Sequence, residues 1–257
     1  IDPIKFEQAI TAKTKAVIVV HLYGQPCEMN SILQVAQKHG IRVIEDAAQA
    51  HGATYGGKKV GSLGDIGCFS FFGNKIITTG EGGMCITNSS KFNDKLRVLR
   101  DHGMNKDKKY WHDEVGFNYR LTNLQAAIGC AQLESIEGFL TKRTQIEKLY
   151  QSILNDYFKI TWQQDFADRK RVAWLVSGLC EDKQLRAILG SCGIEVRSLF
   201  HPLSTMPIYQ EFSSEPCEVA NAVSRAGFSL PTYPGINLEA LEQALLSSIN
   251  LLDLRTA

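Results

Sequence analysis

Short apolar runs alternate with helix-like patterns over the first half of the chain. The run 16–20 (AVIVV) is continuously apolar, which is typical of a strand buried in a parallel sheet. Residues 29–39 then place apolar side chains at helical spacing, and Gly40 follows as a helix stop. Further strands are predicted at 41–44, 66–71 and 83–87. Strands that alternate with helices in this way predict an α/β sheet with right-handed crossovers.

The pattern changes after Thr122, where apolar residues at helical spacing run through 124–133 and again through 139–157. Strands are then predicted at 171–180 and 194–200, and helices at 182–192, 216–226 and 238–252. We interpret residues 1–137 as one domain. Residues 138–257 form a connecting helix and a smaller α+β domain. The chain shows no internal repeat and no low-complexity linker.

Composition narrows the class of protein. The chain has 257 residues, of which 44% are hydrophobic and 21% charged, as in ordinary globular proteins. Its 28 Lys and Arg balance 27 Asp and Glu, so a net charge of +1 gives no basic surface for nucleic acid or an anionic membrane. No apolar run reaches the roughly 18–20 residues that cross a bilayer. We therefore expect neither a nucleic-acid nor a membrane partner.

The seven cysteines are scattered, and no two have the spacing of a metal clip. An odd number of dispersed thiols is typical of a reducing compartment, which predicts a cytoplasmic protein. The histidines outside the C-terminal domain show no metal-ligand pattern. They are His21, His39, His51, His102 and His112. The sequence therefore predicts no metal site.

Asp46 is the first candidate for chemistry. It comes directly after the apolar strand 41–44, in the string EDAAQAHG. In open α/β sheets, ligands bind beyond the carboxyl ends of the strands. An acidic side chain at that edge can partner a cationic ligand atom, or it can cap the loop that follows. This segment alone leaves both roles open.

Lys75 is the second candidate. The string FSFFGNK at 69–75 leads from an apolar strand into a loop, and the glycine-rich TTGEGG follows. A lysine in such a place can lose part of its hydration, which favours the neutral, nucleophilic amine. The alternative is an ordinary surface lysine. An acid after one strand and a lysine after another, with Ser70 five residues before the lysine, together predict a functional site.

Three strings carry a family resemblance: VIEDAAQAHG, FSFFGNKIITTGEGG and VGFNYRLTNLQAAIG. In this order and spacing they resemble the DegT/DnrJ/StrS group of sugar aminotransferases, which are fold-type I enzymes using pyridoxal 5′-phosphate (PLP). The resemblance covers essentially the whole chain, including FHPL at 200–203. It implies an α/β fold-type I transferase with a mixed, mostly parallel sheet flanked by helices, incomplete at the N-terminus. Residues 1–137 would be the C-terminal part of the large PLP-binding domain, followed by a smaller C-terminal α+β domain.

The resemblance also implies roles for individual residues. Lys75 matches the lysine that holds PLP through a Schiff base and is the implied catalytic residue. Asp46 would face the pyridine nitrogen and keep it protonated, so that the ring withdraws electrons. Gln49 would lie near the phenolic oxygen of the cofactor, and Ser70 would hydrogen-bond its phosphate. His201 matches a position that often lines the sugar-nucleotide pocket.

Asn118 matches an asparagine that, in this family, reaches the phosphate in the neighbouring subunit. Arg120 is the alternative if the alignment shifts by two residues. A homodimer with shared active sites is therefore implied. Family members also have a further segment before the position of Ile1, with a small-residue SGT-type phosphate loop and an aromatic residue that stacks on the ring. Neither has a counterpart here, so we expect this chain to correspond to the C-terminal part of such an enzyme.

The implied reaction is transfer of an amino group from an amino acid, with L-glutamate the expected donor, to a keto group on a nucleotide-linked sugar. The strings YWH and GFNYRLTNLQAAIG resemble the branch that makes perosamine-type 4-amino sugars from a GDP-4-keto-6-deoxyhexose. Two alternatives stay open. One is a PLP-dependent sugar dehydratase, although dehydratases of this fold carry a histidine where Lys75 stands. The other is a catalytically silent fragment that dimerises or binds nucleotide.

Overall fold

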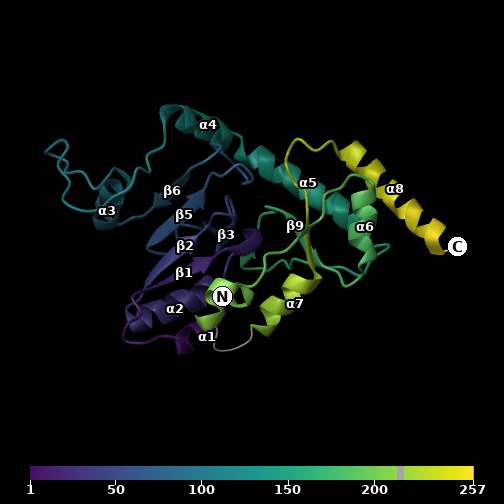
Figure 1. Ribbon diagram of the computed structural model, residues 1–257, viewed down its shortest axis with the longest axis horizontal. Helices are drawn as coiled ribbons and strands as arrows, with labels where there is room; N and C mark the ends of the chain where they lie inside the picture. The colour runs from purple at the N-terminus through teal and green to yellow at the C-terminus, as the bar shows by residue number, and fades with distance from the viewer. Residues whose placement is uncertain (213–216, 257) are drawn as a thin grey trace. The chain divides into compact units, whose positions relative to one another are not determined.

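The computed structural model describes residues 1–212 and 217–256, and the chain divides into two compact units (Figure 1). The first unit comprises Ile1–Leu140 together with Asp165–Trp174. The second comprises Thr141–Gln164 and Leu175–Ala257. The return of residues 165–174 to the first unit is a feature that the sequence pattern did not indicate.

The first unit is built around a four-stranded sheet with the order β1-β2-β5-β6. β1 (Ala16–Val20), β2 (Arg42–Asp46) and β5 (Ile66–Ser70) are parallel, and β6 (Gly83–Ile86) is antiparallel to β5. All four strands lie close to the predicted ranges. The predicted α/β architecture with a mixed, mostly parallel sheet is therefore confirmed.

In β1 and β2, one face of this sheet is covered within the described residues. Val19 and Val43 are buried in a core with residues of α1 (Pro3–Gln8) and α2 (Met29–His39). In Figure 1, α2 lies beside the strands and α1 lies beside α2. The alternate residues of β1 point the other way, and Ile18 is 61% exposed. The expectation of a buried strand is thus wrong for one face of β1. We call this side, which carries Ile18 and the residues in register with it, the open face.

Helix α2 ends as predicted. Gly40 has φ +65° in the left-handed region, and its N–H bonds to the carbonyls of Ala36 and Gln37. The other elements of the first unit are η1 (Leu22–Gly24), the hairpin β3 (Thr54–Tyr55) and β4 (Lys58–Lys59), α3 (Ser90–Arg100) and α4 (Asn123–Glu134). The N-terminus of α4 has a capping box between Thr122 and Gln125.

The return segment is anchored to the first unit by β8 (Arg169–Lys170), which pairs antiparallel with β3. The Arg169 guanidinium lies 4.9 Å from the Tyr55 ring centroid and forms a salt bridge with Glu28. Its Nη1 also donates to the carbonyl of Pro26 at 3.3 Å. Because all these partners precede β5 in the sequence, the return segment is held next to the N-terminal part of the sheet.

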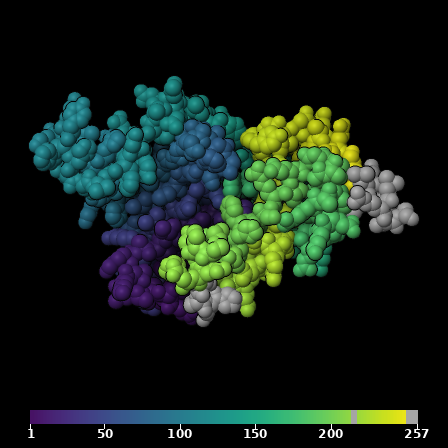
Figure 2. All heavy atoms as spheres, viewed as in Figure 1, coloured from purple at the N-terminus to yellow at the C-terminus, as the bar shows by residue number. Residues whose placement is uncertain are grey.

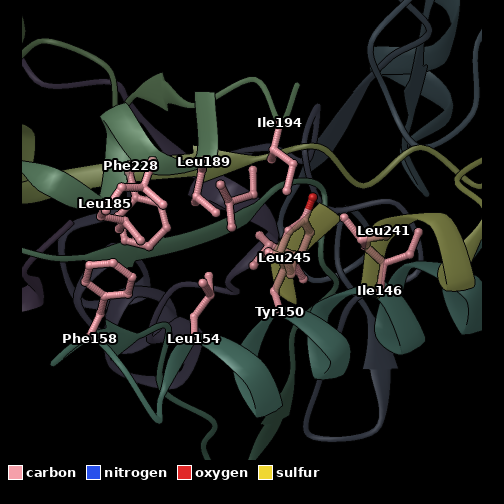
Figure 3. Close-up of a cluster of buried hydrophobic side chains, with 13 residues drawn as sticks. Ile146, Tyr150, Leu154, Phe158, Leu185, Leu189, Ile194, Phe228, Leu241 and Leu245 are labelled. Atoms are coloured by element: carbon pink, nitrogen blue, oxygen red, sulfur yellow. The ribbon is translucent and has the colours of Figure 1, made fainter. Parts of the chain in front are cut away.

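The second unit contains an antiparallel sheet with the order β10-β11-β9-β7. Its strands are β7 (Thr161–Trp162), β9 (Val176–Leu179), β10 (Arg197–Ser198) and β11 (Gly227–Leu230). The helical elements are α5 (Ile136–Leu154), which begins in the first unit, α6 (Gln184–Ser191), η2 (Leu203–Thr205), η3 (Pro207–Phe212), α7 (Glu218–Ala226) and α8 (Leu238–Thr256). Figure 3 shows Tyr150 and Leu154 of α5 in the core of this unit, where the Tyr150 ring lies beside Leu245 of α8.

Two predicted strands of the second unit are shorter than expected. The range 171–180 contains a strand only at β9, because residues 171–174 belong to the first unit and pack there without strand pairing. The range 194–200 contains only β10. The predicted helix 216–226 corresponds to α7, and its first position, Pro216, lies outside the described residues. No helix in the described part of the chain is long and apolar enough to cross a membrane.

Candidate active site

Asp46 and Ser70 both lie where parallel strands end. Asp46 is the last residue of β2 and Ser70 is the last residue of β5. The register pairs Asp46 with Cys68, so Asp46, Cys68 and Ser70 all point to the open face of the sheet. Oδ1 of Asp46 accepts a hydrogen bond from the N–H of Ala48 at 3.0 Å, and Oγ of Ser70 accepts one from the N–H of Phe72 at 3.3 Å. The structure therefore brings these two predicted residues to the same edge and the same face.

Lys75 is half-buried in the turn that follows β5. The turn is closed by hydrogen bonds from the Lys75 N–H to the carbonyl of Phe72 at 3.0 Å and from the Thr79 N–H to the carbonyl of Phe71 at 2.9 Å. Burial lowers the pKa of the Lys75 amine, while the negative charge of Asp46 acts against this and raises it. The amine is thus partly shielded from water and lies within the electrostatic influence of Asp46.

An aromatic side chain that the sequence did not indicate lies against Lys75. Trp174, the last residue of the return segment, is 3% exposed, and its ring centroid is 4.5 Å from Nζ of Lys75. Its indole N–H donates to the carbonyl of Asn74 at 2.8 Å. Tyr23 packs on Trp174, with 5.7 Å between the ring centroids. Trp174 therefore contacts the turn at two points: the backbone carbonyl of Asn74 and the side-chain amine of Lys75. In the sequence it stands inside an apolar run, which predicted only a strand.

Gln49 contacts the same group of residues through Tyr23. Its Oε1 accepts a hydrogen bond from the Tyr23 N–H at 2.6 Å. Tyr23 has φ +51°, an uncommon left-handed conformation for a bulky residue, and this hydrogen bond helps to hold it. Gly24 follows with φ +82°, and a Cβ there would lie 2.0 Å from the carbonyl oxygen of Val172. Because the Gln49 carbonyl is engaged, its amide N–H₂ is the group that can donate to a ligand oxygen.

A buried hydrogen-bonded pair of side chains supports the strand ends from the opposite face of the sheet. Nε2 of His21 donates to Oε2 of Glu45 at 3.0 Å, and both side chains are fully buried. The carboxylate of Glu45 also accepts backbone N–H bonds, each of 2.7 Å, from Gly61, Leu63 and Gly64. Burial alone would raise the pKa of Glu45, yet these hydrogen bonds hold it below its ordinary value. His21 and Glu45 are therefore structural residues that fix the ends of β1 and β2.

The chemistry of this set of side chains fits PLP. An amine that is partly shielded from water can form a covalent bond with the cofactor aldehyde. A carboxylate at the end of a parallel strand can accept a hydrogen bond from a protonated ring nitrogen. The Gln49 amide and the Ser70 hydroxyl add groups that can bond to oxygen atoms. Among the described residues, no group of three or more His, Cys, Asp or Glu side chains is arranged to hold a metal ion.

Asn118 and Arg120 lie in the long segment between α3 and α4, and both are exposed. Asn118 forms an isolated β-bridge with Asp101, and Nη1 of Arg120 lies 3.4 Å from Oδ1 of the same residue. The neighbouring N–H groups of Phe117 and Tyr119 donate to carbonyls at the end of α3. Within one chain, these contacts hold the segment against α3. The proposed reach of Asn118 into a partner's site stays a prediction.

His201 lies in the second unit, between β10 and η2, and its side chain is exposed. It belongs to a different unit from Lys75. Phe200 beside it is 55% exposed and Leu203 is 64% exposed. An exposed imidazole among exposed apolar side chains can bind a ligand, and its role toward a sugar nucleotide stays a prediction.

Comparison with known proteins gives a consistent result. The model of the DegT/DnrJ/EryC1/StrS aminotransferase family matches residues 1–247. The chain is 44% identical to a GDP-perosamine synthase of Caulobacter vibrioides, over 96% of this chain and 70% of that protein. It is 42% identical to a GDP-perosamine synthase of Escherichia coli O157:H7, over 91% of this chain and 64% of that protein. The chain thus spans about two-thirds of the length of these relatives.

Solved structures with a similar fold include aminotransferases. The chain is similar to Helicobacter pylori PseC, an aminotransferase involved in the biosynthesis of pseudoaminic acid, with a TM-score of 0.88 and 30% identity. That match covers 97% of this chain and 70% of the other. It is also similar to S. venezuelae DesV, solved in complex with a ketimine intermediate, with a TM-score of 0.83 and 31% identity. Here the coverage is 95% and 68%. The expected fold class is confirmed by these matches.

Proposed function

The chain belongs to the DegT/DnrJ/EryC1/StrS aminotransferase family, and on that premise we propose that Lys75 binds PLP in a sugar aminotransferase. The reaction would transfer an amino group from an amino acid to a keto group on a nucleotide-linked sugar. One observation carries the proposal. Lys75 is a half-buried lysine whose pKa is lowered by burial and acted on by the carboxylate of Asp46. Burial favours the neutral amine, which is the form that attacks a carbonyl.

The residues of the first unit have separate tasks toward the cofactor. Lys75 would hold it covalently, and Asp46 would keep its ring nitrogen protonated through a charge-assisted hydrogen bond. The Gln49 amide would donate to its phenolic oxygen, and the Ser70 hydroxyl would bond to its phosphate. When bound there, PLP supplies the electron sink for a carbanion at the substrate carbon.

Lys75 would also move a proton. With its amine free, Nζ would take a proton from one carbon and return it to another. A neutral amine is needed for the first half of this task, so the lowered pKa serves it as well. Trp174 lies against Nζ and bonds to the carbonyl before Lys75, so it restricts where the amine can go. Trp174 is therefore a positioning residue in this proposal.

The substrate proposed is a GDP-linked 4-keto-6-deoxyhexose, with L-glutamate as the amino donor and a perosamine-type 4-amino sugar as the product. Two relatives named GDP-perosamine synthase, 44% and 42% identical to this chain, support the choice. His201 would lie against the sugar nucleotide. Because the chain spans about two-thirds of these relatives, the substrate is a property proposed for the whole enzyme. We place that enzyme in the cytoplasm, where sugar nucleotides are used in polysaccharide biosynthesis.

The dehydratase alternative is not favoured. Its chemistry needs a histidine at the position of Lys75, and a lysine that both binds the cofactor and carries a proton fits transamination. The silent-fragment alternative predicts that the chain does not bind PLP through Lys75. A binding experiment therefore separates it from the leading proposal.

The test is covalent trapping of the cofactor. The chain is incubated with PLP, reduced with borohydride and mapped by peptide mass spectrometry. We expect the adduct on Lys75, a visible absorption band before reduction, and loss of both in Lys75→Ala. Lys58→Ala is the matched control, because Lys58 is an exposed lysine of β4 in the same unit. Adducts spread evenly over surface lysines, or an unchanged band in Lys75→Ala, would overturn the proposal. In the full-length enzyme, Lys75→Ala should abolish transamination while the fold is kept.

A further inference from the structure

Two cysteines face each other across the pair of strands that forms the edge of the first unit's sheet. Cys68 of β5 and Cys85 of β6 are register partners in an antiparallel pair. Their Sγ atoms are 3.8 Å apart. The other five cysteines, which lie outside this strand pair, are Cys27, Cys130, Cys180, Cys192 and Cys217. The proposed cofactor chemistry uses neither Cys68 nor Cys85.

The strand register brings the two cysteines within the reach of a disulfide. Directly opposed residues in an antiparallel pair have Cα atoms about 4.5–5.5 Å apart, and disulfides span about 4.4–6.8 Å between Cα atoms. The sulfur atoms need to approach from 3.8 Å to about 2.05 Å, which side-chain rotation can achieve without moving a strand. We propose that Cys68 and Cys85 form a reversible disulfide, a thiol modification site on the open face beside Asp46.

The two thiols differ in exposure and in acidity. Cys85 is exposed, and Cys68 is half-buried. The hydrogen bond with Cys68 lowers the pKa of Cys85, although burial acts against it. The same hydrogen bond, together with burial and the nearby charge of Asp46, raises the pKa of Cys68. Cys85 is therefore the thiol that reacts first with an oxidant, and Cys68 is the thiol that resolves the product.

With hydrogen peroxide as the oxidant, the reaction balances in two steps. The Cys85 thiolate attacks one peroxide oxygen, an S–O bond forms and the O–O bond breaks. The leaving hydroxide takes up the proton that Cys85 lost and departs as water. Cys68 then attacks Sγ of Cys85, the S–S bond forms and the S–O bond breaks. The second hydroxide takes the proton of Cys68 and leaves as water. Two thiols are oxidised and one peroxide is reduced to two waters.

Oxidation would change the surroundings of Asp46. Cys68 is the register partner of Asp46, and their side chains share the open face. Drawing the Cys68 sulfur toward Cys85 alters what packs beside the Asp46 carboxylate. Resting on the proposed function, we expect the disulfide form to retain PLP less firmly than the dithiol form. The disulfide itself does not depend on the cofactor assignment.

The first arm of the test measures the disulfide alone. The reduced chain is treated with graded hydrogen peroxide, its remaining thiols are alkylated, and its peptides are mapped by mass spectrometry. We expect a Cys68–Cys85 cross-linked peptide at the lowest effective dose, with two of the seven thiols lost and both restored by dithiothreitol. Cys85→Ser and Cys68→Ser should each abolish this peptide. Cys130→Ser, at another exposed cysteine, should leave it unchanged.

Two results in that arm would overturn the proposal. One is oxidation of Cys85 to sulfinic acid without any link to Cys68. The other is cross-linking only between chains. Circular dichroism shows whether each variant has kept its fold. If one of the two serine variants fails to fold, the other still tests the cross-link.

The second arm measures PLP retention, by absorbance after gel filtration, in reduced and oxidised protein. Weaker retention after oxidation, recovered with dithiothreitol and absent in Cys85→Ser, supports the link to Asp46. Equal retention in a chain that is shown to be cross-linked overturns that link. A reduced chain that never binds PLP contradicts the cofactor assignment, and the cross-linking result then still stands by itself.

Discussion

At the scale of single residues, Lys75 is subject to two opposing influences. Burial lowers the pKa of its amine, and the carboxylate of Asp46 raises it. Trp174 contributes to that burial, because its ring lies 4.5 Å from Nζ. With these two opposing effects on its pKa, the Lys75 amine can lose its proton to attack a carbonyl while the Asp46 carboxylate stays nearby.

The first prediction concerns Asp46. In the chain without cofactor, Asp46→Asn removes the charge that raises the pKa of Lys75, so this pKa should fall further. NMR of reductively ¹³C-methylated lysines measures it as a function of pH. In the complete enzyme, the same variant should keep PLP but lose activity by at least about a hundredfold, because a neutral amide does not hold the ring nitrogen protonated.

Asp107→Asn is the matched control, since Asp107 is exposed in the segment between α3 and α4. It should leave both the titration of Lys75 and the rate unchanged. If Asp46→Asn behaves like this control, Asp46 only caps the loop after β2, and the cofactor geometry proposed here is wrong.

At the scale of elements, the site depends on how the ends of the strands are held. The buried carboxylate of Glu45 in β2 bonds to His21, just after β1, and to the loop at 61–64 that leads into β5. One side chain thus connects three successive parts of the sheet. Asp46, next in sequence, points to the opposite face and is positioned by the same strand.

The second prediction is that Glu45→Gln destabilises the fold by about 3 kcal/mol at neutral pH. An amide nitrogen would face N–H donors, and the charge-assisted hydrogen bonds to the buried carboxylate would be lost. Urea denaturation of both forms measures the difference. Gln37→Glu, on the solvent-exposed side of α2, is the control for exchanging an amide and a carboxylate. It should change the free energy of unfolding little.

The loss of stability in Glu45→Gln should also depend on pH. The pKa of Glu45 is below its ordinary value of 4.5, so the unfolded chain binds this proton more tightly than the folded chain. The contribution of Glu45 to the free energy of unfolding is therefore present above that ordinary value and lost as pH falls through the folded-state pKa. Between about pH 6 and about pH 3, stability should fall more steeply in the native chain than in Glu45→Gln. Parallel curves would show that Glu45 is not held as a buried carboxylate.

At the scale of the whole molecule, a large apolar surface of the first unit lies open. Leu124 and Ile128 of α4 are 80% and 50% exposed, and Tyr119 before this helix is 72% exposed. α4 has no buried residue. Figure 2 shows this part of the chain, coloured teal, at the surface of the first unit. Extended apolar surface of this kind fits a contact with a partner subunit, or with the part of the relatives' length that this chain does not span. It supports the proposed homodimer, in which Asn118 would reach the partner's site.

The third prediction tests the shared site with mixed dimers of Asn118→Ala and Lys75→Ala subunits of the complete enzyme. Each homodimer should be inactive or nearly so. In the mixed dimer, one site carries both changes and the other carries neither, so activity should reappear, up to half of the native value per dimer. Asn118→Ala should also weaken PLP retention more than subunit association.

Differently tagged subunits allow mixed dimers to be isolated before the assay. Arg120→Ala paired with Lys75→Ala tests the alternative register. If isolated mixed dimers with Asn118→Ala show no recovery, Asn118 serves its own subunit's site or none.

The sequence by itself determined the alternation of strands and helices and the position of Asp46 at the end of a strand. These are local consequences of side-chain period and of where apolar runs stop. It also placed Lys75 in the turn after β5, because the glycines that follow the apolar strand mark a loop. The three strings of the family resemblance lie in or beside these same strands and turns.

Only the tertiary structure decided which distant residues meet. Trp174 lies against Lys75 because the chain leaves the first unit after Leu140 and returns for residues 165–174, and no local period encodes such a return. The open face of β1 was missed because five apolar residues in a row do not show which face is covered. The opposition of Cys68 and Cys85 likewise follows from strand register, which pairing across the sheet sets and spacing along the chain does not.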